Sequence, residues 1–298
     1  MTHKIPVILD TDIGSDIDDT WALALLLKSP ELDLKLVVTD TGNTTYRAQV
    51  AAKLLEVAGR TDVPVAIGIH QSDKCGPQAP WVKEYDLATY PGTVRTDGVQ
   101  ALIDTIMTSP EPVTLIAIGP LPNIAAALRQ EPRIADNARF VGMHGSVRLG
   151  YNGAPEISAE WNVVADTAAC RAAFAAPWDV TITPVDTCGL VRLTGEAYAR
   201  VRDCADPLVQ AMIENYRVWA SRMEGTQRDA ESASSTLFDT VAVYLAFAEE
   251  WCVMEDLGLR VTDDGHTLLD QSAKPIRCAT AWRDLPAFEE FLVSRLTE

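Results

Sequence analysis

The sequence predicts an α/β fold with an open, mostly parallel β-sheet and helices on both of its faces. Short apolar segments alternate with longer segments whose apolar residues recur at helical spacing, and the joints between them are short. Strand, helix and strand joined in this way form right-handed crossovers, which place the strands in parallel. No linker rich in Gly, Ser or Pro divides the 298 residues, so we expect a single domain over 1–298.

The elements follow one another regularly in the first part of the chain. Strands are expected at 7–9, 34–39, 63–68, 113–118, 140–143 and 180–184, and helices at 21–27, 45–58, 97–109, 124–129 and 167–175. This Rossmann-like alternation ends near residue 185. Extra C-terminal helices are expected at 194–203, 207–223 and 239–249, then two short strand-like segments at 259–262 and 266–269, and a closing helix from Leu285.

Two long segments lack periodicity and are candidates for mobile loops. Residues 70–96 carry Trp81, Tyr85 and Tyr90 among prolines, glycines and charges, and residues 224–235 are polar. A connection as long as 70–96 is rarely idle in a compact domain, so we expect a lid or a binding loop there.

Composition restricts the partners. A net charge of −17 repels phosphate backbones and anionic lipids, so nucleic acid polymers and membrane surfaces are not expected partners. Six cysteines without a C-x-x-C pair indicate a reducing compartment, and the N-terminus runs directly into a strand without a leader. We therefore expect a cytoplasmic protein that binds a small ligand.

The most informative stretch is the loop after the first strand, which carries five aspartates: Asp10, Asp12, Asp16, Asp18 and Asp19. Asp16 or Asp18 is suited to cap the following helix, but capping uses one or two carboxylates and not five. Carboxylates packed this closely repel one another, so a hard divalent cation is expected to compensate them. The spacing does not match an EF-hand, because its glycine comes too early and no closing Glu follows.

Five motifs in one order carry a family resemblance. They are D-T-D-I-G-S-D-I-D-D at 10–19, T-G-N at 41–43, V-T-L-I-A-I-G-P-L-P-N-I-A at 113–125, A-E-W-N at 159–162 and L-F-D-T-V-A-V-Y at 237–244. Over nearly its whole length the chain resembles the inosine-uridine-preferring nucleoside hydrolase family. The resemblance implies Ca²⁺-dependent hydrolysis of the N-glycosidic bond of ribonucleosides, a role in purine or pyrimidine salvage, and a homodimer or homotetramer.

The resemblance also implies roles for individual residues. Asp12, Asp19 and Asp239 and the backbone carbonyl of Ile118 would hold the Ca²⁺, an oxygen-only ligand set. A metal-bound water would attack C1′ of the ribose, with Asp12 as general base.

Further residues would surround the substrate: Asp18 and Asn162 at the ribose diol, Asn43 beside Asp12, Glu160 and Asn152 at the 5′-hydroxyl, and Met143 along the sugar. Carboxylates that face the ring would stabilise an oxocarbenium-like transition state. Two of these residues also have simpler interpretations, since Asn43 could make a turn and Asn162 could cap a bend.

Three features depart from the family's pattern. The aspartate loop is two residues longer, which leaves Asp16 without a counterpart. The segment between Met143 and Glu160 is also longer than usual, so the match at Asn152 is offset by a residue or two. Where many members carry a histidine before the last metal aspartate, this chain has Phe238.

Because phenylalanine cannot donate a proton, another group must help the base to leave. His144, Tyr85 and Arg228 are candidate donors, although His144 could simply bond to the backbone. Alternatively, Trp81 and Phe238 stack on the base and solvent protonates it. We prefer stacking, because it explains an aromatic residue at 238.

Two other functions remain as alternatives. A haloacid-dehalogenase-like phosphohydrolase also begins with a strand that ends in D-x-D, but Gly14 and the pair Asp18 and Asp19 fit it poorly. A nucleoside- or ribose-binding protein without catalysis is compatible with Phe238. The sequence does not identify the preferred base.

Overall fold

The described strands of the chain form one continuous mixed sheet. The computed structural model describes residues 3–223 and 229–298. The sheet order is β4-β3-β2-β1-β5-β6-β7-β10-β8-β9, and all pairs from β4 to β10 are parallel. β8 and β9 extend the sheet with antiparallel pairing. The strands are β1 (Ile5–Thr11), β2 (Leu32–Thr39), β3 (Val65–Ile67), β4 (Val94–Arg95), β5 (Val113–Ala117), β6 (Ala138–Met143), β7 (Val180–Thr183), β8 (Cys252–Val261), β9 (Thr267–Leu269) and β10 (Pro275–Trp282).

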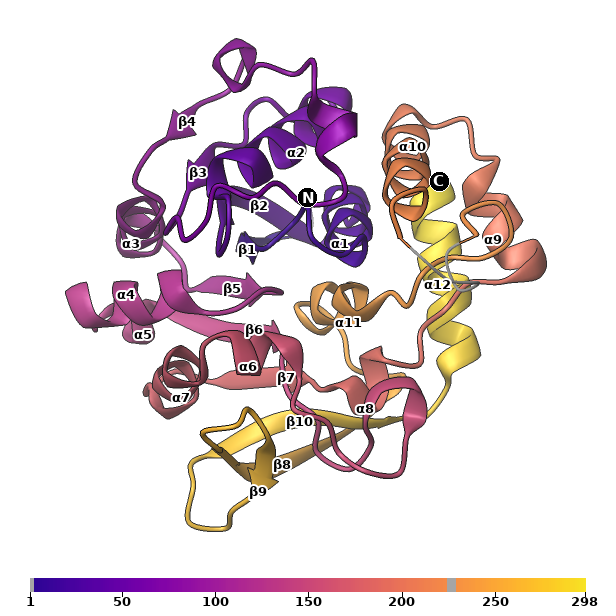
Figure 1. The fold of residues 1–298 in the computed structure, drawn as a ribbon. Coiled ribbons are helices and arrows are strands. Elements are labelled where there is room, and N and C mark those ends of the chain that lie inside the picture. Colours follow the sequence, from indigo (N-terminus) through magenta and orange to yellow (C-terminus); the bar gives the residue numbers. More distant parts are fainter. Residues whose placement is uncertain (1–2, 224–228) are drawn as a thin grey trace.

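Helices cover both faces of this sheet (Figure 1). Along the first part of the chain they are α1 (Asp18–Lys28), α2 (Thr44–Val57), α3 (Gly98–Thr108), α4 (Pro122–Gln130), α5 (Ile134–Asn137), α6 (Trp161–Ala165) and α7 (Thr167–Ala175). The later ones are α8 (Val185–Cys188), α9 (Gly195–Arg202), α10 (Pro207–Ala220), α11 (Phe238–Leu245) and α12 (Leu285–Thr297). Helices α9, α10 and α12 lie together on one side, with α11 between them and the sheet (Figure 1).

Strand β1 supplies apolar side chains to both faces. Leu9 of β1 pairs with Val37 of β2 and Ile116 of β5. Val7 and Leu9 belong to one buried apolar cluster and Ile8 belongs to the other, as expected when alternate side chains point to opposite faces. A strand buried on both faces therefore reads as a continuous apolar run.

The order of the strands reverses at β1. β2, β3 and β4 continue to one side, whereas β5, β6 and β7 continue to the other. The loops that leave β1 and β5 at their carboxyl ends therefore diverge to opposite faces, and such a switch point is where open α/β sheets bind ligands.

The predicted fold class is confirmed, and three local expectations need correction. Neither Asp16 nor Asp18 caps α1, because the N-cap is Ile17 and no side chain caps it. Strand β10 was not predicted, although it pairs with β7 and anchors β8. The segment 70–96 is not entirely irregular: it contains two short 3-10 helices and β4, and Trp81 and Tyr90 are buried.

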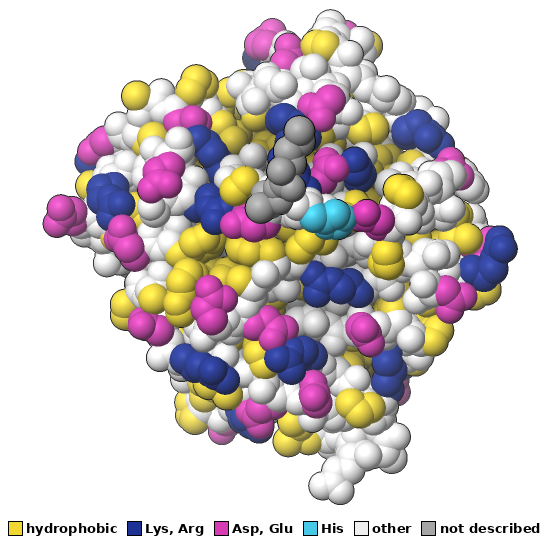
Figure 2. All heavy atoms as spheres, turned by 180° about the vertical axis from the view of Figure 1, so that it is seen from behind, with side chains coloured by type: hydrophobic (Ala, Val, Ile, Leu, Met, Phe, Trp, Pro, Cys, Tyr) yellow, Lys and Arg dark blue, Asp and Glu magenta, His cyan; other side chains and the backbone are white. Residues whose placement is uncertain are grey.

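Acidic side chains are spread over the face of the molecule shown in Figure 2. On the face shown in Figure 2, Asp and Glu side chains are interspersed with Lys, Arg and apolar side chains. Within the described residues, every helix is too short or too polar to span a bilayer.

Candidate active site

A cavity of about 1170 Å³ lies at the carboxyl ends of the central parallel strands. The loops after β1, β2, β3, β5 and β6 line it, together with the first turns of α1 and α11. Of the residues predicted to form the site, those that line the cavity are Asp12, Asp18, Asp19, Asn43, Ile118, Met143, Glu160, Asn162, Phe238 and Asp239. The structure thus brings together residues that are more than 200 positions apart in the sequence.

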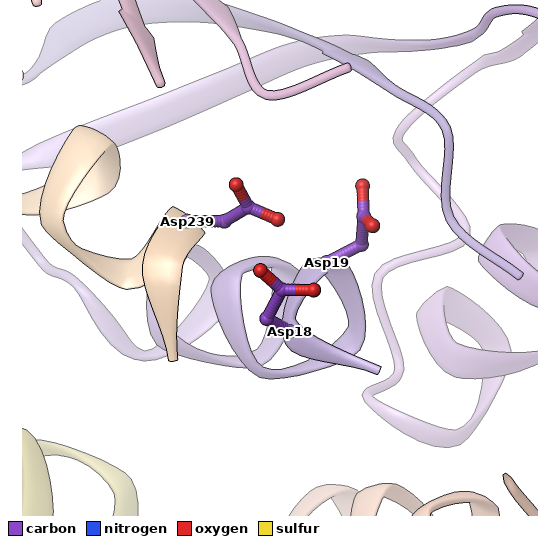
Figure 3. A group of neighbouring side chains, drawn as sticks. All are labelled: Asp18, Asp19 and Asp239. Carbon is purple, nitrogen blue, oxygen red and sulfur yellow. The ribbon is translucent and has the colours of Figure 1, made fainter. Parts of the chain in front are cut away.

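Three buried aspartates form the densest group. Asp18 and Asp19 lie in the first turn of α1, and Asp239 lies in the first turn of α11. One carboxylate oxygen of each lies within 4.8 Å of the others, and the three side chains face one another between the two helices (Figure 3). Burial raises the pKa of all three carboxyls well above the ordinary value of 3.8, and neighbouring carboxylates add to this rise: chiefly Asp16 for Asp18, Asp12 for Asp19 and Asp18 for Asp239. A cation at this place would compensate the buried negative charges and favour the ionised carboxylates.

Asp12 lies beside this group but outside the set of three. Its Oδ2 accepts a 2.6 Å hydrogen bond from Ser15 Oγ and lies 3.6 Å from Arg47 Nη2. Asp12 is nevertheless close to Asp19, because its charge is the largest neighbouring charge that raises the pKa of Asp19. The group of three thus differs from the metal ligands that the resemblance implies. It contains Asp18, which the resemblance assigns to the ribose diol, and Asp12 lies next to it.

Asp10 lies beneath the cavity and not in it. Its Oδ2 accepts a 2.9 Å hydrogen bond from Asn123 Nδ2, and burial raises the pKa of the Asp10 carboxyl to about 7. The buried Asp40 adjoins it, and burial and repulsion by Asp10 also raise the pKa of Asp40. Of the five aspartates of the loop, four therefore line the cavity, whereas Asp10 is buried beneath it. The sequence did not distinguish these two positions.

Asn162 joins two strands at the sugar side of the predicted site. Its Nδ2 donates hydrogen bonds of 3.1 Å to the carbonyl oxygens of Ile118, after β5, and Met143, at the end of β6. The side chain therefore orients the carbonyl of Ile118 that the resemblance assigns to the metal. The alternative, in which Asn162 caps a bend, does not apply, because Glu160 is the N-cap of α6.

Glu160 is held rigidly by backbone donors. Its carboxylate accepts hydrogen bonds from the backbone N–H groups of Asn162, Val163 and Gly145. Burial raises the pKa of Glu160 to about 7 in spite of these donors.

The two remaining amides differ in their positions. Asn43 lines the cavity and caps α2, since its Oδ1 accepts from Tyr46 N at 3.0 Å and its Nδ2 donates to Asp73 O at 3.0 Å. Asn152 is exposed, has a left-handed backbone (φ 58°) and lies outside the described cavity lining, where the neighbouring Tyr151 is present instead.

Two residues that were predicted to help the base to leave, Trp81 and His144, are not among the described residues that line the cavity. Trp81 is buried, donates from Nε1 to Glu214 at 3.1 Å and packs under Lys53 Nζ. His144 is fully buried, its Nε2 lies 3.1 Å from the carbonyl oxygen of Gly119, and burial lowers its pKa to about 4. Neither is among the described lining residues, which corrects the expectation that they face the substrate.

The other candidates have different outcomes. Tyr85 donates to Glu56 on the surface, away from the cavity. Arg228 lies outside the described residues, as does the part of the second predicted loop at 224–228. Phe238 does line the cavity and packs edge-on against Tyr151, with ring centroids 5.9 Å apart and planes at 84°.

Sequence reasoning missed Arg47, which lines the cavity beside Asp12. A signal was present, because Arg47 lies in the first turn of the helix predicted at 45–58, directly after the T-G-N motif at 41–43. It also missed Tyr151, which lies outside the five motifs, and the exposed Trp161, which lies within the A-E-W-N motif but was given no role.

Comparisons with known proteins agree on one family. The family model described as "Inosine-uridine preferring nucleoside hydrolase" matches residues 7–289. A pyrimidine-specific ribonucleoside hydrolase RihA of Citrobacter koseri is 31% identical over 70% of this chain and 69% of its own length. A probable uridine nucleosidase 2 of Arabidopsis thaliana is 28% identical over 94% of this chain and 90% of its own length.

Solved structures show the same fold. A plant nucleoside hydrolase superimposes with a TM-score of 0.83 at 23% identity and covers 99% of both chains. A purine-preferring ribonucleoside hydrolase from Gardnerella vaginalis superimposes with a TM-score of 0.78 at 22% identity over 98% of both chains.

Proposed function

The chain belongs to the inosine-uridine preferring nucleoside hydrolase family, and on this basis we propose that it hydrolyses the N-glycosidic bond of ribonucleosides to the free base and ribose. The observation that carries the proposal is the group formed by Asp18, Asp19 and Asp239 at the floor of a cavity large enough for a nucleoside.

A Ca²⁺ ion is the proposed cofactor, held by Asp12, Asp19 and Asp239 and the carbonyl of Ile118. The donor set fits, because it consists only of oxygen atoms, and because burial leaves the carboxylates of Asp19 and Asp239 in need of positive charge. When bound, the ion would fix the ribose hydroxyls and lower the pKa of a coordinated water.

The chain's own residues would then orient the substrate and move protons. Asp18 and Asn162 would accept from and donate to the ribose diol, and Glu160 would hold the 5′-hydroxyl. Asp12 would take the proton from the attacking water, since its carboxylate is held by Ser15 and lies among the other carboxylates. The negative charges around the sugar would stabilise the positive charge that develops on the ring.

The aromatic ring of Phe238 is proposed to stack on the base. It lines the cavity, and the edge-on contact with Tyr151 holds its ring in a defined orientation. Because the two relatives are a uridine nucleosidase and a pyrimidine-specific hydrolase, we include uridine among the proposed substrates.

The remaining properties are also proposals. Residues 1–298 act as one catalytic domain in the cytoplasm, in a homodimer or homotetramer, and serve purine or pyrimidine salvage. Nothing in the described cavity calls for nucleic acid polymers as substrates.

A reducing-sugar assay over a panel of ribonucleosides tests the proposal directly. Release of ribose with stoichiometric free base supports it. The alternative of a binding protein without catalysis predicts that nucleosides bind, as measured by calorimetry, without release of sugar. Release of phosphate from small phosphate esters would instead support the phosphohydrolase alternative.

A further inference from the structure

Arg47 is the one buried cation among the described residues that line the cavity. Its side chain is 11% exposed, whereas the other lining cations, Lys74 and Arg222, are exposed. Its Nε donates to the carbonyl oxygen of Thr41 at 2.8 Å and its Nη1 donates to that of Ile13 at 3.0 Å. These two bonds hold the guanidinium in one orientation.

The remaining nitrogen of this guanidinium faces Asp12. Nη2 lies 3.6 Å from Asp12 Oδ2, which is too long for a hydrogen bond, and no described hydrogen bond from Nη2 is present. A guanidinium carries five N–H donors, so Arg47 retains donors at the cavity after its two backbone bonds are made. A built, oriented cation beside the proposed base is therefore available to a ligand.

The position of Arg47 along the cavity is informative. Glu160 and Asn162 lie over β6, whereas Arg47 lies over β2 beside the segment 71–77 that follows β3. In the order β2-β1-β5-β6, three strand spacings separate Arg47 from Glu160 and Asn162, which is roughly 14 Å at the usual spacing of neighbouring strands. If Glu160 holds the 5′ end of the sugar, the base extends toward the end that carries Arg47.

Charge distinguishes the two ends. Apart from Arg47 and the exposed Lys74, the side chains that line the end over β2 and β3 are uncharged and include Asn43, Gln71 and Ser72, and Asp12 borders this end 3.6 Å from Arg47 Nη2. The carboxylates gather in the middle and over β6. An anion that develops at the leaving base would be repelled by the carboxylates and attracted by Arg47.

Resting on the proposed function, we propose that Arg47 is a catalytic residue that stabilises the leaving base as an anion. As the bond from C1′ to the base nitrogen breaks, its electron pair passes to that nitrogen and, by conjugation, to a carbonyl oxygen of the base. Arg47 donates N–H hydrogen bonds to this developing anion. The oxygen of water bonds to C1′, Asp12 takes the proton, and the base takes one proton from solvent after it leaves.

Arg47 in this role would assist departure of the base in a site that has Phe238 where many family members have a histidine. Phenylalanine has no proton to give, and among the described candidates His144, Trp81 and Tyr85 do not line the cavity. Arg47 supplies charge stabilisation without giving up a proton, because guanidinium stays protonated. The inference also names a substrate class: bases that carry a carbonyl oxygen next to the glycosidic nitrogen, as uracil does.

The test compares two leaving groups in the wild-type enzyme and in variants. Uridine loses a poorly stabilised anion, whereas p-nitrophenyl riboside loses a phenolate that needs little help. We expect Arg47→Met to lower kcat/KM for uridine about 100- to 1000-fold, as for removal of one transition-state donor, and for the nitrophenyl riboside less than about 10-fold. Arg47→Lys, which keeps the charge, should recover part of the loss on uridine.

Controls separate this role from others. Arg95→Met, at an exposed arginine of β4 that pairs with Asp104 of α3 and is not among the described lining residues, should change neither rate. Thermal melting checks that the Arg47 variants fold, and Arg47→Gln replaces Arg47→Met should the latter not fold.

Each outcome decides the inference. Equal losses on both substrates would mean that Arg47 only holds the loops at Ile13 and Thr41, and would overturn its role at the base while leaving the proposed function intact. A wild-type enzyme that releases sugar from neither substrate would overturn the proposed function and this inference together.

Discussion

The side-chain amide of Asn162 donates a 3.1 Å hydrogen bond to the carbonyl oxygen of Ile118. A carbonyl has two lone pairs, so this bond leaves one of them for a cation. Asn162→Ala should therefore release the carbonyl and weaken Ca²⁺ binding about 10- to 100-fold, as is usual when a group that orients a metal ligand is lost. Calcium titration calorimetry measures the change, with Asn137→Ala on the surface as the control. An unchanged affinity would contradict the assignment of Ile118.

Removal of the metal should destabilise the protein. Asp239 is buried with a raised pKa, so its charge needs a cation at neutral pH. A ligand that binds only the folded state contributes about 2.7 kcal/mol at one hundred times its dissociation constant, and a chelator should lower Tm accordingly.

A variant makes this prediction specific. Asp239→Asn relieves the repulsion, so it should melt higher than the metal-free wild type at pH 7.5, should not respond to the chelator and should have little turnover. Asp104→Asn, at an exposed residue of α3, should behave as the wild type does. Full activity in a demonstrably metal-free preparation would refute the metal site.

Sugar specificity should exceed base specificity. Asp18, Asn162 and Glu160 are buried polar groups, and a substrate without its hydroxyl would leave them unpaired. The loss typically costs ~1–3 kcal/mol, so 2′-deoxyuridine should have a kcat/KM about 5- to 150-fold lower than uridine. Comparable values for the two nucleosides would show that the diol is not recognised.

Glu160 predicts a pH dependence of stability in metal-free protein. Its pKa is about 7 in the folded state against an ordinary 4.5, so the folded state binds the proton more tightly. The stability that this provides is fully present below about pH 4.5 and is lost as the pH rises through about 7, with a magnitude of roughly 3 kcal/mol.

The measurement compares urea unfolding of the wild type and Glu160→Gln, both in chelator, from pH 4.5 to 8. Because other buried carboxyls titrate in both proteins, the difference between the two curves isolates Glu160. We expect the wild type to lose more stability over this range than the variant, and parallel curves would contradict the prediction.

Phe238 should matter most for bases that leave poorly. Phe238→Leu removes the aromatic face and should lower kcat/KM for uridine several-fold more than for p-nitrophenyl riboside, because stacking eases departure of the base. Phe238→His should be tolerated or should raise activity on poor leaving groups. If Phe238→Leu lowers both rates equally, the ring serves only to pack against Tyr151.

Much of the fold was readable from local patterns. The apolar run at 7–9 and the periodic helix after it are properties of short segments, and both are confirmed as β1 and α1. Strand β10 escaped because Pro275–Trp282 begins with a proline and contains Arg277 and two alanines, so it has no clear apolar run, and its pairing with β7 and β8 makes it a strand. The same limit applies to the cap of α1, where Ile17 takes a position that sequence preference assigns to an aspartate.

The sequence by itself determined the fold class, the aspartate-rich loop at a strand end and the family. Each of these depends on a pattern along the chain: the apolar periodicity, the cluster of aspartates or the order of the motifs. Only the tertiary structure decided which polar and aromatic residues face the cavity. Asp10 and His144 became buried, Trp81 packed under Lys53, and Arg47 came to face Asp12. These outcomes depend on the directions of side chains from distant segments and on the competition for buried hydrogen bonds, which no local pattern encodes.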